Sequence, residues 1–151
     1  MKKIFFAAIL FISTSAQAAL EVFACEPEWA ALTQQLAGGK ASIYTATGAL
    51  QDPHRVEARP SLIARARRAN LVVCTGAELE AAWLPVVLRE SGNPAVQSGR
   101  PGFFEAAQHV VMLEIPSRLD RVDGDVHALG NPHIQTDARN FCRSQTRSAS
   151  V

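Results

Sequence analysis

Two of the four histidines directly follow a proline, a spacing suited to holding a metal ion. His54 closes Asp-Pro-His at residues 52–54, and His133 closes Asn-Pro-His at residues 131–133. Neutral imidazole is the commonest nitrogen ligand for zinc and similar ions. Proline restricts its own backbone and that of the preceding residue, so each loop can present its histidine at little ordering cost. We take both as candidate metal ligands, with surface histidines in turns as the alternative.

The other two histidines have different surroundings. His127 ends Gly-Asp-Val-His at residues 124–127, just before the second tripeptide. It is either an auxiliary ligand that helps to capture the ion or a loop histidine held by hydrogen bonds. His109 precedes an apolar run and has no motif around it, so we expect it to be structural or exposed.

The segments around these residues alternate between β-rich apolar runs and helical spacing. Strands are predicted at residues 20–24, 41–47, 70–74 and 110–113. Helices are predicted at residues 28–36, 61–69 and 77–91, with a helical turn at 103–107. Pro85 should kink or divide the third helix. This alternation predicts an α/β fold, a single doubly wound lobe with a roughly four-stranded, mostly parallel sheet flanked by helices.

In such folds ligands bind beyond the carboxyl ends of the strands, and the candidate residues follow strands. Cys25 and Cys74 end the first and third predicted strands, which are neighbours in the common doubly wound order. Their Cα atoms would then lie within disulfide range, and we predict that bond. The alternative is a pair of thiolate ligands that join the histidines. Cys142 should be unpaired.

Three blocks of sequence follow one another along the chain. The first joins Asp-Pro-His to Glu57 and to Pro-Ser at residues 60–61. The second reads Ala-Asn-Leu-Val-Val from residue 69 and continues through Gly76, Leu79-Glu80 and Trp83-Leu84. The third joins Asn-Pro-His to Asp137 and Asn140. These blocks are similar to D-P-H-x-x-E-x-x-P-S-D, A-D-L-V-V-x-N-G-x-x-L-E-x-W-L and D-P-H-x-W-L-D-P-x-N. The chain thus resembles the N-terminal lobe of the periplasmic solute-binding proteins of zinc and manganese ABC transporters, over roughly residues 20–140.

Six positions depart from these motifs, and none of them removes a histidine. They are Leu62, Asn70, Thr75, Asn131, Gln135 and Ala138. The extended Gly-Asp-x-His form around His127 is similar to one subgroup of these proteins. We interpret the chain as a divergent member.

The resemblance implies that His54 and His133 are metal ligands, with His127 as a third candidate. Such a nitrogen-rich set favours Zn²⁺ over Mn²⁺. Asp52, Glu57 and Asp137 are expected to fix the loops rather than bind the ion. The implied function is capture of zinc, or of manganese, for an ABC importer, without catalysis. The implied partner is an inner-membrane permease, and we expect a monomer.

The N-terminus is typical of an export signal. Lys2 and Lys3 precede an apolar run at residues 4–12, and Ala-Gln-Ala at residues 16–18 matches a cleavage site. An uncleaved anchor is the alternative, although the run is shorter than the ~20 residues that span a bilayer. We predict a signal peptide at residues 1–18, a periplasmic location and a lobe at residues 19–140. The net charge of +1 gives no indication of a nucleic-acid or membrane-surface partner.

The tail, residues 141–151, is rich in Ser and Arg and lacks helical periodicity, so we predict disorder. The family's linking helix and the ligands of its second lobe have no counterpart in the sequence. We hypothesise a truncated paralogue with an out-of-frame tail and impaired binding, which a second-lobe reading frame just downstream would support.

Two other functions stay open. The first is a metal-dependent phosphoesterase, because Gly-Asp-x-His and Gly-Asn-x-His superficially resemble its blocks. The Asp-x-His that such an enzyme needs after its first strand is missing here. The second is a stand-alone periplasmic zinc chaperone.

Overall fold

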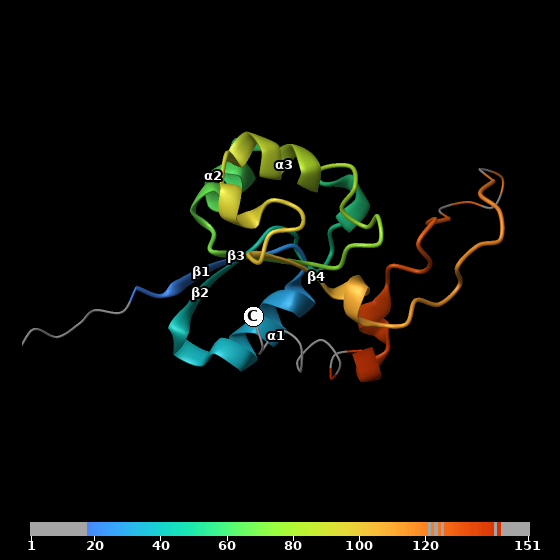
Figure 1. The fold of residues 1–151 in the computed structure, drawn as a ribbon, viewed down its shortest axis with the longest axis horizontal. Helices are drawn as coiled ribbons and strands as arrows, with labels where there is room; N and C mark the ends of the chain where they lie inside the picture. The colour runs from blue at the N-terminus through green and yellow to red at the C-terminus, as the bar shows by residue number, and fades with distance from the viewer. Residues whose placement is uncertain (1–17, 121, 123, 125, 141, 143–151) are drawn as a thin grey trace, which may run out of the picture.

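Four short parallel strands form one sheet with helices on both faces (Figure 1). The computed structural model describes residues 18–120, 122, 124, 126–140 and 142. The predicted signal peptide up to residue 17, and the predicted tail apart from Cys142, lie outside the described residues. The strands are β1 (Leu20–Ala24), β2 (Ala41–Thr45), β3 (Leu71–Cys74) and β4 (Phe103–Glu105). Their order is β2-β1-β3-β4, and every neighbouring pair is parallel. The α/β prediction is confirmed, including the placement of the first and third strands side by side.

The fourth strand lies earlier in the chain than predicted. Phe103 and Phe104 pair with Val72 and Val73, and Phe104 is only 8% exposed. A Cβ atom on Gly102 would lie 2.5 Å from the carbonyl oxygen of Ala95, so only glycine lets the chain enter the sheet here. The predicted strand at 110–113 is wrong: the run forms no strand, and although Val110 and Met112 pack against the core, Val111 is 70% exposed.

The helices begin at prolines or carry one in the first turn, where a missing N–H costs nothing. They are α1 (Pro27–Ala37), α2 (Pro60–Arg68) and α3 (Leu84–Ser91). The predicted start of α3 at residue 77 is wrong. Gly76, Ala77 and Glu78 all have positive φ values, which no helix accommodates. No helix in the described ranges is both long and apolar enough to cross a membrane.

The two faces of the sheet bury separate clusters, because alternate residues of a strand point to opposite sides. Phe23 and Val72 pack against α2 and α3, together with Trp83. Val22 and Val73 pack on the other face against α1, where Trp29 is buried. The segment after β4, orange to red in Figure 1, lies to one side of this layered body.

Candidate metal site

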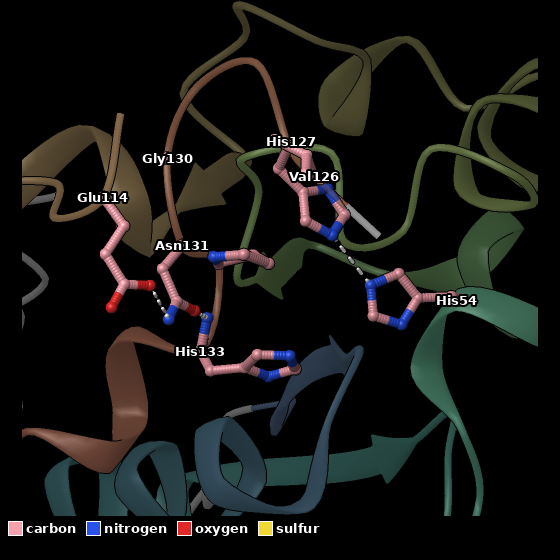
Figure 2. Close-up of a pocket in the computed structure, with 8 residues that line it drawn as sticks. His54, Glu114, Val126, His127, Gly130, Asn131 and His133 are labelled. Carbon is pink, nitrogen blue, oxygen red and sulfur yellow. Dashed lines mark hydrogen bonds between the residues drawn. The ribbon is translucent and has the colours of Figure 1, made fainter. Parts of the chain in front are cut away.

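Three histidines from distant parts of the chain line one pocket of about 280 Å³ (Figure 2). His54 comes from the loop after β2, whereas His127 and His133 come from the long segment after β4. The pocket also contacts Glu114, Val126 and the loop residues 130–132. This is the neighbourhood that the sequence blocks indicated, at the carboxyl-end side of the sheet.

The closest pair of ring nitrogens is His54 Nε2 and His127 Nε2, 3.1 Å apart. Two nitrogen ligands of a tetrahedral zinc ion lie about 3.3 Å apart, given Zn–N bonds of about 2.05 Å. The ring centroid of His133 lies 6.0 Å from that of His54. His54 is 21% exposed at its side chain, and His133 is exposed. The histidines therefore form an open, nitrogen-rich cluster within reach of an ion from solvent.

His54 is held by the residue two positions before it. Asp52 Oδ1 accepts hydrogen bonds from His54 N and from His54 Nδ1, each at 3.0 Å. These bonds lower the pKa of Asp52, the backbone N–H contributing most. With Nδ1 as the donor, Nε2 is left with its lone pair toward the pocket. Trp83 Nε1 donates to the carbonyl oxygen of Pro53 at 2.9 Å, which joins this turn to the core.

His133 sits in a turn of the same design. Asn131 Oδ1 accepts from His133 N at 2.9 Å, as Asp52 does from His54. Either oxygen can accept this bond, so the departure from D-P-H at Asn131 preserves the turn. Thr136 Oγ1 donates to the His133 carbonyl oxygen at 2.7 Å and closes the next turn.

The remaining candidates lie outside the pocket lining. The Asp137 carboxylate pairs with Arg139 at 2.7 Å, in the turn that follows His133. The Glu57 side chain is exposed and makes no hydrogen bond within the described part of the chain, although its carbonyl oxygen accepts from Arg59 N. His109 stacks on Phe104 with ring centroids 4.7 Å apart.

Cys25 and Cys74 are joined through their Sγ atoms at the ends of β1 and β3, with Cα atoms 4.9 Å apart. Both residues are fully buried. A carboxylate oxygen of Glu80 lies within 4.8 Å of both sulfurs. Since the sulfurs are bonded to each other, they offer no thiolate to an ion. Cys142 is exposed and unpaired.

A buried pair of carboxyl groups, Glu26 and Glu80, lies beside the disulfide and was missed by sequence reasoning. Glu80 accepts from Thr75 N at 2.8 Å and from Gly76 N at 3.0 Å. Thr75 Oγ1 donates to Glu26 Oε2 at 3.2 Å. Burial raises the pKa of both groups, and the charge of Glu80 raises that of Glu26 further. Glu26 therefore keeps its proton at neutral pH.

Comparison with known proteins connects this lobe to metal uptake. The family model described as "Zinc-uptake complex component A periplasmic" matches residues 22–144. Among proteins with curated descriptions, none matches the chain by sequence. Several solved structures share the fold.

Three of those structures illustrate the likeness. A zinc-bound deletion mutant of ZnuA is 22% identical, with a TM-score of 0.66, and the match covers 87% of this chain and 45% of that one. The periplasmic zinc-binding protein TroA from Treponema pallidum is 18% identical, with a TM-score of 0.63 and coverage of 87% and 43%. The manganese-bound periplasmic metal-binding protein from Candidatus Liberibacter asiaticus is 16% identical, with a TM-score of 0.62 and coverage of 85% and 44%. The chain thus spans less than half the length of these neighbours.

Proposed function

Since the chain belongs to the zinc-uptake complex component A family, which is periplasmic, we propose that it binds zinc there on behalf of an ABC importer. The observation that carries the proposal is the histidine cluster, in which His54 and His127 place their Nε2 atoms 3.1 Å apart with His133 beside them. Family membership supports a metal-binding transport component and a permease as its partner. We further propose that the chain has no catalytic role.

Zinc suits the pocket better than manganese. Its histidines supply nitrogen, which zinc favours, whereas manganese prefers carboxylate and carbonyl oxygens. The likeness to a zinc-bound ZnuA mutant supports this choice, and the manganese-bound neighbour makes manganese the second candidate.

This lobe alone should hold the ion weakly. Zinc sites in proteins have four ligands, and the pocket offers three imidazoles. The fourth position would fall to water or to a ligand from outside the described residues. His133 is exposed, so solvent competes for the ion at that side.

Calorimetric titration of residues 19–151 with Zn²⁺ tests the proposal. We expect His54→Ala to abolish measurable binding, because it removes one nitrogen of the closest pair. His109→Ala is the matched control: it removes a histidine that stacks on Phe104 outside the pocket lining, and it should leave the zinc affinity unchanged. Absence of binding in the parent chain, or equal affinities in the parent chain and His54→Ala, would contradict the proposal.

A further inference from the structure

His127 lies in a loop that is closed at its neck, and His133 follows directly after that neck. Asn131 N donates to the carbonyl oxygen of Leu113 at 2.9 Å, so the chain returns to its starting point after seventeen residues. Gly130 has a φ of 101°, and a Cβ atom there would lie 2.6 Å from the same carbonyl oxygen. Only glycine permits this close crossing. The neck therefore fixes where the second Asx-Pro-His turn begins.

Glu114 stands at this neck and is linked to His133 through one residue. Its Oε2 accepts from Asn131 Nδ2 at 2.8 Å, and Asn131 Oδ1 accepts from His133 N at 2.9 Å (Figure 2). An asparagine side chain whose amide is fixed at one end presents its oxygen in a fixed direction at the other. The Glu114 carboxylate thus orients the group that holds His133.

Glu78 makes a second hydrogen bond to the loop, next to His127. Its Oε2 accepts from Ala128 N at 2.8 Å, one residue beyond His127. Glu78 belongs to the turn between β3 and α3, which is anchored to the sheet. The loop is therefore held by one carboxylate from the sheet body and by another at its own neck.

Both glutamates hold an unfavourable backbone conformation. Three non-glycine residues of the described chain have positive φ values: Ala77 at 49°, Glu78 at 70° and Glu114 at 56°. Left-handed backbone at such residues has an energetic cost and persists where the surroundings demand it. Two of the three, Glu78 and Glu114, accept a hydrogen bond from the segment that carries His127 and His133. The strained backbone therefore coincides with the contacts that hold this segment.

We propose that Glu78 and Glu114 are positioning residues for the metal site, which hold His127 and His133 in place without binding the ion. The inference rests on the proposed function. Glu114 also lines the pocket, but in Figure 2 its carboxylate lies on the far side of Asn131 from His54 and is directed at the amide. A direct ligand role for Glu114 is an outcome that the test distinguishes.

Substitution of each glutamate by glycine and by glutamine distinguishes a role in positioning the histidines from a role in the stability of the fold alone. Glu114→Gly and Glu78→Gly relieve the left-handed backbone but remove the acceptor. We expect a 10–100-fold loss of zinc affinity, as for other groups that orient ligands, with an unchanged or higher melting temperature. Glu114→Gln and Glu78→Gln keep an acceptor oxygen and should restore the affinity. Ala77→Gly is the matched control: it relieves the same kind of backbone without removing a hydrogen bond, so the affinity should not change.

Amide hydrogen exchange gives a readout without metal. In the metal-free chain, Ala128 N–H in Glu78→Gly loses its acceptor and should exchange roughly tenfold faster, the worth of one hydrogen bond. His133 N–H in Glu114→Gly keeps its acceptor on an Asn131 side chain that is no longer fixed, so it should exchange faster by a smaller factor. Glycine variants with parental affinity and exchange would overturn the inference. A loss in Glu114→Gln equal to that in Glu114→Gly would also overturn it, in favour of a charged ligand. If the parent chain fails to bind zinc, the proposed function fails, while the exchange rates still decide whether the carboxylates hold the loop.

Discussion

The ends of β1 and β3 and the histidine loops lie at the same side of the sheet, yet they are built in opposite ways. At the strand ends, Cys25 and Cys74 are bonded to each other, and the carboxyl groups of Glu26 and Glu80 are buried beside them. In the loops, His54 and His133 reach solvent, and each is held by one Asx side chain. From this difference we infer that the strand-end residues stabilise the fold and the loop residues bind the ion. Substitutions at the strand ends should therefore lower stability without weakening zinc binding, and substitutions in the loops should do the reverse.

Removing the disulfide should cause the largest loss of stability. Cys25 and Cys74 are 49 positions apart, and the chain-entropy model gives about 4 kcal/mol for closing such a loop. Urea unfolding of Cys25→Ala/Cys74→Ala should show a decrease of this order in the free energy of unfolding. The zinc affinity of the folded fraction, measured at low temperature, should stay the same. A parallel loss of affinity would show that the strand ends and the loops are coupled after all.

Glu26→Gln should weaken the dependence of stability on pH. The folded chain keeps the Glu26 proton while the unfolded chain releases it above the ordinary value of 4.5, so stability falls as pH rises toward the raised folded pKa. One such proton is worth at most about 1.4 kcal/mol per pH unit. Glutamine has no proton to release, and it has nearly the same size and shape as the glutamic acid that it replaces. Melting temperatures between pH 5 and 9 should therefore decline less steeply than in the parent chain.

Glu80→Gln is the companion variant for that experiment. Glu80 accepts from two backbone N–H groups, and a glutamine amide nitrogen would face one of these donors. We expect a loss of about 1–3 kcal/mol, from a buried donor left without an acceptor. Because Glu80 itself has a raised pKa of about 7, its removal should also make the decline in stability less steep below that pH. An equally steep pH dependence in Glu26→Gln and in the parent chain would assign the slope to other groups.

Asp52→Ala should give the smallest change, and only in binding. Asp52 is exposed and holds the His54 ring at Nδ1, so its loss frees the ring without opening the core. We expect roughly tenfold weaker zinc binding, the lower end for a group that orients a metal ligand. Asp52→Asn keeps an acceptor oxygen and should recover most of the affinity. Calorimetry and melting curves together would show whether binding changes while stability does not.

Periodicity and turn chemistry predicted much of the fold. The first three strands were recognisable as buried β-rich runs, and the Asx-Pro-His tripeptides indicated stiff turns that the structure places beside one pocket. The fourth strand escaped because Phe103 and Phe104 are followed by a longer apolar run, which is only partly buried and forms no strand. Apolar character alone does not say which run is buried.

The parts of the site that escaped depend on tertiary contacts. Glu78 and Glu114 carry no local signal, since left-handed backbone at glutamate is set by the segments around it. The pairing of Glu26 with Glu80 requires two strand ends to meet across 54 positions of sequence. The second block contains Glu80, but nothing in its spacing indicates a buried acid.

From the strand order β2-β1-β3-β4 we expect the strands to pair in a definite order during folding. β1, α1 and β2 form one local unit, so β1 can acquire its first neighbour from the chain directly behind it. Its second edge stays open until β3 arrives, because β3 begins at Leu71, 47 positions after β1 ends at Ala24, with α2 in between. Because Cys25 and Cys74 lie at the ends of these two strands, we expect their bond to form fastest once β3 has paired with β1, since that pairing holds the two Cα atoms 4.9 Å apart. The rate at which the two thiols disappear during refolding would therefore time the pairing of β3 with β1.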